Sequence, residues 1–213
     1  MATRSIPVTS AFNFASPGTV QLNASAPNVL LRSSTVHVLA LVYVDSSGMP
    51  ADQKVFTIPG VLTLGTATPG GGSQPVLYPE VWDNQGNRYA FQAGRVPTDQ
   101  WALIEVIWTR GGSLAGLING VQVKSIPVSA NPLKSPSNNP THNYVGSFWD
   151  RSSFPFMGMI QSVLMTNAAD LAVTQAYAIT PSGAISNWGS NGFLLSGGAA
   201  VTTLSAPPDR RSR

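Results

Sequence analysis

Hydrophobic and polar positions alternate most regularly in residues 101–126, which hold three segments of strand length separated by two turn signals. In residues 101–109, apolar side chains recur at every second position, which is the period of a pleated strand. Residues 110–113 interrupt the pattern, and Asn119 and Gly120 separate the second segment from the third. Both of these residues tolerate the positive φ of a type I′ turn. The sequence therefore predicts a three-stranded antiparallel meander.

Residues 33–44 alternate in the same way, but both faces of the expected strand are largely apolar, as in the central strand of a sandwich. A helix is expected at residues 167–178, where Asn167 or Asp170 could cap it. Further strands are expected within residues 6–20, 55–64, 76–82, 88–93, 143–148, 156–165 and 186–204, with residues 65–75 as a loop. The pattern predicts an all-β fold with one short helix.

Composition agrees with a turn-rich β-protein. Only 10% of the 213 residues are charged, and the 20 glycines and 17 prolines are scattered rather than repeated. Neither a disordered chain nor a collagen is therefore indicated. A chain of this length can bury a substantial core in one large all-β domain. We expect one β-sandwich domain over residues 1–205, followed by a basic, Pro-containing C-terminal tail at residues 206–213.

The net charge of +3 is concentrated at the C-terminus. Arg210, Arg211 and Arg213 lie there with Asp209, which leaves nine basic against eight acidic residues in the rest of the chain. This nearly neutral body argues against nucleic-acid binding, and a short run of arginines at a chain end is most often solvated. The alternative is that the three arginines contact an acidic surface of a partner.

The chain has no cysteine, so disulfides and thiolate metal sites cannot contribute. Its first residues lack the apolar core of a secretory signal, and no apolar run approaches the length of a membrane span, about 18 residues. We therefore expect a protein made in the cytoplasm, without a signal peptide or a transmembrane segment.

Candidate catalytic residues are few. His37 lies in a predicted strand, and a packed or hydrogen-bonded imidazole is the favoured interpretation, because no Ser-His-Asp arrangement surrounds it. The three glycines at residues 70–72 could cradle a phosphate, but neither a Lys-Ser/Thr pair nor a helix follows them. A mobile loop is the better interpretation of that stretch.

The tip of the hairpin expected at residues 76–93 carries Asp83, Asn84 and Asn87. Carboxylate and amide oxygens are calcium ligands, so these residues are the candidates for a metal site. One carboxylate among neutral amides is a poor calcium site, and Asx residues are also ordinary turn residues. We expect no cofactor, with calcium as the alternative.

Several features of the C-terminal half occur together in a known family. They are Trp101 with its alternating strand, the Asn119-Gly120 turn, Tyr144-Val145-Gly146, Phe156-x-Gly158-x-Ile160 and the short Ala/Leu segment that follows. With these features the chain resembles the concanavalin A-like, laminin G-like jelly-roll superfamily. The resemblance implies a sandwich of two antiparallel sheets that binds carbohydrate or protein. Gln161 departs from the family pattern, which commonly has an acid there, and this weakens any inherited metal or polar site.

Some members of that superfamily are glycosidases, which need two or three carboxylates facing a substrate groove. The only glutamates of this chain are Glu80 and Glu105. Glu80 and Asp83 are three residues apart and would point to opposite faces of a strand, and Glu105 has no acidic neighbour two residues on. We therefore expect no enzymatic activity.

One loop-proximal segment carries the groups that sugars need, namely aromatic rings beside amide, carboxylate and basic groups. The candidate carbohydrate-binding residues are Asn143, Tyr144, Trp149, Asp150 and Arg151. The alternative interpretation is that residues 148–149 end a strand and pack into the core.

Two functions remain open from the sequence. The leading hypothesis is a structural virion component, such as a phage capsid-decoration, head-fibre or tail protein, that contacts other virion proteins and copies of itself. The lack of cysteine, the sparse charge and the Pro-containing ends support it. The alternative is a carbohydrate-binding lectin module acting on its own. The two are compatible, because a virion protein can use a lectin-like fold to hold host-surface glycans.

Overall fold

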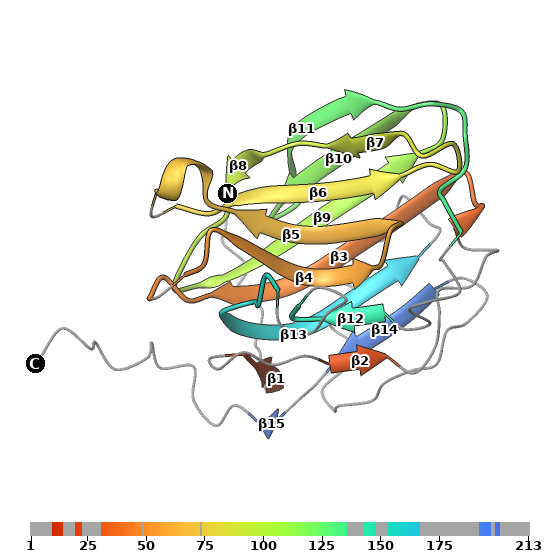
Figure 1. Cartoon of the computed structure of the whole chain (residues 1–213). Coiled ribbons are helices and arrows are strands. Elements are labelled where there is room, and N and C mark those ends of the chain that lie inside the picture. The colour runs from red at the N-terminus through yellow and green to blue at the C-terminus, as the bar shows by residue number, and fades with distance from the viewer. Residues whose placement is uncertain are drawn as a thin grey trace, which may run out of the picture.

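A computed structural model of the chain describes residues 10–14, 20–22, 31–47, 49–72, 74–135, 143–147, 153–166, 192–196 and 199–200. These residues form two antiparallel sheets that lie face to face as the two layers of a sandwich (Figure 1). The all-β sandwich expected from the sequence is confirmed. The helix expected at residues 167–178 falls outside the described residues.

The larger sheet has eight strands. Seven lie in the order β11 (Val121–Pro127), β10 (Ser113–Ile118), β9 (Trp101–Thr109), β3 (Thr35–Val44), β13 (Gly158–Thr166), β1 (Ser10–Asn13) and β15 (Ala199–Ala200), and β14 (Gly192–Ser196) also pairs with β13. β3 is central, and all of its residues after Thr35 are buried. This confirms the prediction from its two apolar faces.

The smaller sheet has seven strands. Six lie in the order β2 (Val20–Leu22), β12 (Asn143–Val145), β4 (Asp52–Ile58), β5 (Leu62–Ala67), β6 (Val76–Trp82) and β7 (Arg88–Ala90), and β8 (Ala93–Arg95) pairs with the start of β6. In Figure 1, β4, β5 and β6 lie in front of β3, β9 and β13.

Three segments differ from the sequence prediction. Residues 6–20 hold β1 and only the first residue of β2, and the two strands belong to different sheets. Residues 55–64 hold the end of β4 and the start of β5, because the chain turns at Pro59 and Gly60. The loop expected at residues 65–75 begins with the end of β5 and contains a short 3₁₀ turn, η1 (Pro69–Gly71).

The hydrophobic core fills the space between the sheets. The two central examples, β3 and β6, contribute alternate side chains to it, as the pleat requires. From β3 these are Val36, Val38, Ala40, Val42 and Val44. From the facing β6 they include Leu77 and Val81. The side chains that alternate with them, Val76, Tyr78, Glu80 and Trp82, therefore point to the outer side of the smaller sheet.

The predicted meander is confirmed, because β10 pairs with both β9 and β11 in antiparallel register. Asn119 and Gly120 have φ angles of 52° and 77°, as their turn requires. The Oδ1 atom of Asn119 also accepts a hydrogen bond from the N–H of Leu103 at 2.8 Å, which fixes the turn to the start of β9.

The glycine at the start of β13 permits a close approach of two strands. Gly158 has a φ of 136°, and a Cβ atom at this position would collide with the carbonyl oxygen of Tyr43 in β3. A side chain would therefore push apart the two central strands of the larger sheet. The close backbone approach expected at Gly158 is confirmed.

Candidate functional site

The outer side of the smaller sheet carries a group of aromatic and charged side chains centred on β6. Leu77 and Val81 of this strand face the core, so Tyr78, Glu80 and Trp82 face outward. The register of the sheet brings Lys54 of β4 and Arg88 of β7 beside them. Tyr78 pairs with Gly65, which pairs with Lys54, and Trp82 pairs with Arg88.

Lys54 crosses β5 to reach the ring of Tyr78. Its Nζ atom lies 4.6 Å from the centroid of Tyr78 and 5.3 Å from that of Phe154, within the range of cation–π attraction. A Cβ atom at the intervening Gly65 would collide with the carbonyl oxygen of Gln53 and lie 3.3 Å from Cδ of Lys54. The glycine therefore leaves the space through which the lysine stem passes. Burial lowers the pKa of Lys54, although the charges of Glu80 and Asp52 oppose this.

The guanidinium of Arg88 is held by two partners. Its Nε donates to Oε1 of Glu80, and an Nη atom donates to the hydroxyl of Tyr78 at 2.7 Å. The hydrogen bond to Glu80 raises the pKa of Arg88, and burial raises the pKa of Tyr78. The side chain of Arg88 is still 53% exposed. A positioned guanidinium thus lies at the surface between two aromatic residues of β6.

Phe154 belongs to the segment that leads to β13, and it lies beside Lys54 of β4. Its side chain is 41% exposed, and its φ of 55° is uncommon for a bulky residue. The N–H of Lys54 donates to the carbonyl oxygen of Phe154 at 3.0 Å, which ties this segment to β4. Backbone strain of this kind is concentrated at functional sites, so Phe154 is a candidate contact residue.

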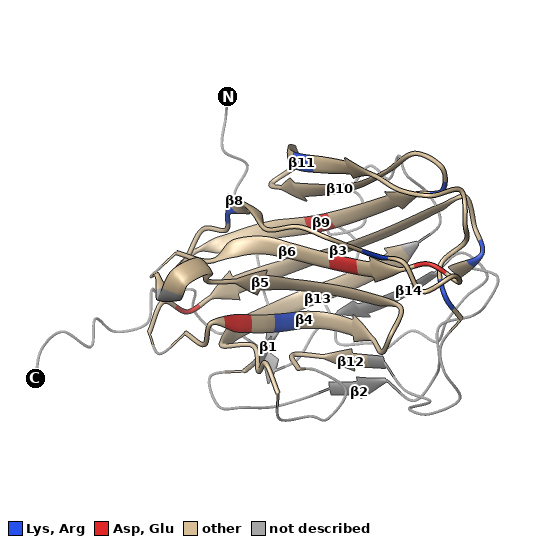
Figure 2. Cartoon of the chain, turned by 45° about the horizontal axis from the view of Figure 1, so that its top comes forward, with Lys and Arg blue, Asp and Glu red and all other residues tan. Residues whose placement is uncertain are grey.

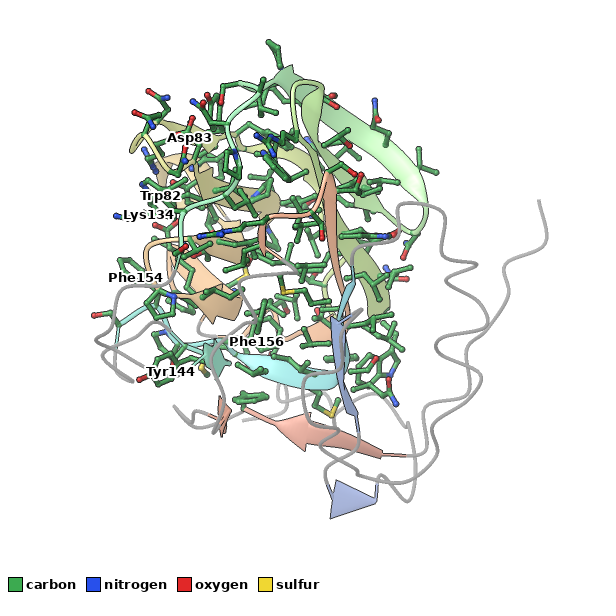
Figure 3. The ribbon with its side chains drawn as sticks, turned by 90° about the vertical axis from the view of Figure 1, so that its right-hand side faces the viewer. Trp82, Asp83, Lys134, Tyr144, Phe154 and Phe156 are labelled. Atoms are coloured by element: carbon green, nitrogen blue, oxygen red, sulfur yellow. The ribbon has the colours of Figure 1, made fainter. Side chains whose placement is uncertain are left out.

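Lys134 lies next to Trp82 at the other end of this group. The N–H of Lys134 donates to the carbonyl oxygen of Trp82 at 2.9 Å. Leu133 is buried in the core, so the neighbouring Lys134 points outward, and both labelled side chains lie on the same side of the molecule in Figure 3. We call this set of residues the β6 face. It consists of Lys54, Tyr78, Glu80, Trp82, Arg88, Lys134 and Phe154, and Figure 2 shows its charges on β4 and β6 turned toward the viewer.

The carbohydrate-binding residues expected from the sequence fall partly on this side of the sheet. Tyr144 of β12 pairs with Thr57 of β4 and is 3% exposed. Thr57 lies on the outward side with Lys54, so Tyr144 belongs to the same layer as the β6 face, but it is packed rather than open. Asn143 lies next to it in β12. Trp149, Asp150 and Arg151, and the tail residues Arg210, Arg211 and Arg213, fall outside the described residues.

Asp83 is the centre of a hydrogen-bond network rather than an open ligand group. Its Oδ1 accepts from the N–H groups of Gln85 and Asn87, each at 2.9 Å. Its Oδ2 accepts from the side chains of Asn87 at 2.8 Å, Ser129 at 2.8 Å and Asn131 at 3.0 Å. Burial would raise the pKa of Asp83, but these hydrogen bonds outweigh it and lower the pKa.

This arrangement bears on the calcium candidates. The structure brings Asp83 and Asn87 together, but through a hydrogen bond in which the amide of Asn87 donates. Both carboxylate oxygens of Asp83 already accept two or more hydrogen bonds, which is the chemistry of a turn anchor. Asn84 contributes its N–H to the carbonyl oxygen of Pro132. Within the described residues, no group of three or more His, Asp or Glu side chains could hold a metal ion.

His37 is hydrogen-bonded, as expected. Its Nε2 lies 3.0 Å from Oε2 of Glu105, and the two side chains are 2% and 3% exposed. Both residues lie on the outer side of the larger sheet, since Val36, Val38, Ile104 and Val106 face the core. This pair is remote from the β6 face, which lies on the outer side of the opposite sheet.

Sequence reasoning missed most of the β6 face. A signal was present in Tyr78, Glu80 and Trp82, which recur at every second position of a strand flanked by apolar residues. That spacing predicts three polar or aromatic groups on one face. The contribution of Lys54 could not be found in this way, because it depends on pairing across three strands, and Phe154 is placed by a contact between Lys54 and a segment 100 residues away.

Comparison with known proteins gives fold neighbours only. No protein-family model matches the chain, and no curated protein matches it. A proposed carbohydrate-binding protein from Bacteroides ovatus is 18% identical, with a TM-score of 0.63 over 90% of this chain and 58% of that one. The K499G mutant of the NanB sialidase from Streptococcus pneumoniae is 14% identical, with a TM-score of 0.56 over 84% of this chain and 29% of that one. The CBM40 of the Ruminococcus gnavus IT-sialidase, bound to alpha2,3 sialyllactose, is 14% identical, with a TM-score of 0.51 over 72% of this chain and 84% of that one.

These similarities show a shared fold, an antiparallel β-sandwich. The chain spans 58% of the Bacteroides ovatus protein and 29% of the NanB sialidase. Fold alone does not carry activity from one protein to another. In the part of the chain that the structure describes, no helix is long and apolar enough to cross a membrane.

Proposed function

We propose that the chain is a non-enzymatic, lectin-like carbohydrate-binding module whose contact surface is the β6 face. The observation that carries this proposal is the juxtaposition of Trp82, Tyr78 and Phe154 with charged side chains on one rigid sheet. Aromatic rings offer a flat apolar surface to the C–H face of a sugar, and the polar groups beside them hydrogen-bond its hydroxyls.

The sheet supports this role because it fixes the rings. Trp82 and Tyr78 alternate with core residues of the same strand, so their backbone cannot shift without disturbing the core. The fold neighbours named for carbohydrate binding support the class of ligand by analogy. Of the residues expected from the sequence, Asn143, Trp149, Asp150 and Arg151 stay candidates for sugar contact, whereas Tyr144 is packed.

The test is a glycan array followed by titration calorimetry with the strongest ligand found. We expect Trp82→Ala and Phe154→Ala each to weaken binding by about tenfold or more, which is the loss of ~1.4 kcal/mol of contact energy. Val121→Ala removes an apolar side chain that is 68% exposed on the other sheet and serves as the control. We expect the control to bind like the native protein, and a blank array, or binding unchanged in both aromatic variants, would reject the β6 face.

A second candidate is that the chain is a virion component that uses this lectin-like surface to hold host-surface glycans. The cysteine-free, sparsely charged sequence and the exposed Val121 at the edge strand β11 support it. This role requires contacts with copies of the chain or with other virion proteins, for which Arg210, Arg211 and Arg213 are candidates. Light scattering of the purified protein, alone and mixed with particles that lack it, tests this. A monomer with no affinity for such particles would reject it.

A further inference from the structure

We infer that the glycan bound by the β6 face is anionic, and that Arg88 and Lys134 bind its carboxylate or sulfate group beside Trp82. This inference rests on the proposed function and specifies its ligand class. It comes from the distribution of charge over the two sheets and from the geometry around Trp82.

Basic side chains are concentrated on the outer side of the smaller sheet. Of the seven Lys and Arg residues in the described part of the chain, four lie there by register or by direct contact with β6, namely Lys54, Arg88, Arg95 and Lys134. The acidic residues on that side are Asp52 and Glu80. The other described residues hold three Lys or Arg and four Asp or Glu. Lys54 is itself buried, 4% exposed, so the positive charge that a ligand can reach on this side comes from Arg88, Arg95 and Lys134, against the partly exposed Asp52.

Glu80 does not cancel this charge for a ligand. Its carboxylate is buried, 8% exposed, and is already bound to Nε of Arg88. Its effect is to orient the guanidinium, which the hydroxyl of Tyr78 holds from a second direction. Arginine is suited to carboxylate and sulfate groups because its planar donors are fixed relative to one another. Within the described residues, the second terminal nitrogen of Arg88 has no acceptor, and the side chain is 53% exposed.

Trp82 lies between the strand that carries Arg88 and the segment that carries Lys134. Arg88 is its cross-strand partner on β7, which places their Cβ atoms about 4.5–5.5 Å apart. On the other side, the backbone of Lys134 hydrogen-bonds to Trp82 itself, and its exposed side chain points outward beside the indole (Figure 3). A sugar ring that stacks on Trp82 could carry an acidic substituent at either edge of the ring, and that substituent would lie near Arg88 or near Lys134. An aromatic platform with a cation on each side selects for anionic over neutral sugars.

The first experiment is an array of neutral, carboxylated and sulfated glycans probed with the full chain at 0.05 M and 0.3 M salt. We expect the bound glycans to be anionic and their binding to weaken at high salt. For a carboxylated ligand, reducing its carboxyl groups to alcohols should weaken binding by about tenfold or more. Retention of sulfated glycans only would identify sulfate as the anion instead. Strong binding of neutral glycans would overturn this inference and leave the proposed function standing, whereas binding to no glycan would overturn both.

The second experiment assigns the contact to these residues. Lys134→Gln removes an exposed charge next to Trp82, and Lys124→Gln removes one from β11 of the other sheet as a matched control. We expect the first variant to lose about fivefold to tenfold in affinity for the anionic glycan and the second to bind like the native protein. Arg88→Lys keeps the positive charge but loses the planar pair of guanidinium donors, and we expect a comparable loss of affinity. Equal losses in Lys134→Gln and Lys124→Gln would mean general charge attraction and would overturn the assignment.

Discussion

The Nε2 atom of His37 lies 3.0 Å from Oε2 of Glu105, and this contact joins the central strands β3 and β9 on the outer side of the larger sheet. Both side chains are buried, and among the described residues the second polar atom of each, Nδ1 of His37 and Oε1 of Glu105, has no hydrogen-bond partner. Removing one member of a buried pair leaves the other member buried without a partner or water. Replacing both members by apolar residues removes the cost of desolvating either one.

This pair therefore predicts non-additive effects on stability. We expect Glu105→Leu and His37→Leu to lower the free energy of unfolding by about 3 kcal/mol each, and the double variant to lose clearly less than the sum. Urea denaturation of the four proteins measures the coupling. Additive losses would show that the two side chains act independently.

Asp83 predicts a large effect from a single turn residue. Asp83→Ala leaves the donors of Asn87, Ser129 and Asn131 without their acceptor, and we expect a loss of about 3 kcal/mol in unfolding free energy. The control is Asp99→Asn at an exposed loop position, for which we expect less than about 1 kcal/mol. Similar losses in the two variants would contradict the role of Asp83 as an anchor.

The same carboxylate predicts a dependence on pH. The pKa of Asp83 is lower in the folded protein than the ordinary value of 3.8, so the folded state binds its proton less readily. Its stabilisation is complete above that ordinary value and is lost as pH falls from there through the lower folded pKa. We expect the difference in Tm between the native protein and Asp83→Ala to be constant from pH 7 to 5 and to shrink below pH 4. A constant difference down to pH 2 would contradict this.

Lys54 predicts a conflict between stability and binding. Burial lowers its pKa, so the folded state disfavours the charged form despite the two rings beside it. Lys54→Met keeps the stem and removes the charge, and we expect it to raise the unfolding free energy by about 1 kcal/mol at pH 7 while weakening glycan binding. Because the pKa of Lys54 is lower in the folded than in the unfolded state, the unfolding free energy of the native protein should rise relative to that of Lys54→Met as pH rises toward 10.5. Chemical denaturation at pH 7 and 10 measures the stability of the two proteins, and titration calorimetry measures their glycan binding.

The turn at Asn119 allows its two contributions to be separated. Asn119→Gly keeps the positive φ and loses the hydrogen bond to Leu103, whereas Asn119→Ala loses the bond and strains the backbone as well. We expect losses of about 1 kcal/mol for the glycine variant and about 2 kcal/mol for the alanine variant. Equal Tm values for the two variants would show that the backbone conformation adds no cost.

The sequence predicts a structural feature correctly where that feature depends only on residues close together in the chain. The alternation in residues 101–109 and the two apolar faces of β3 depend only on local pattern, and both were predicted correctly. The turn at Asn119 and Gly120 was predicted for the same reason, since the residue types carry the required φ.

Predictions from sequence did not reach contacts that depend on register. Lys54 meets Tyr78 only because β4, β5 and β6 pair with Gly65 between them, and a β-bulge interrupts the β4–β5 register after Lys54. The sequence makes Asp83 a calcium candidate because of its carboxylate beside two Asn residues, but it does not show the partners Ser129 and Asn131, which lie more than 45 residues away in the chain. No local pattern connects those segments.

The alternation along β6 separates two kinds of sequence change. Substitutions at Leu77 and Val81 alter the interior, whereas those at Tyr78, Glu80 and Trp82 alter the surface offered to a ligand. A lineage carrying this strand could exchange its outward residues and acquire a new binding preference while its interior stayed intact. A combinatorial library restricted to those three outward positions should therefore yield folded proteins with diverse ligands, and one at the two inward positions should yield chiefly unfolded ones.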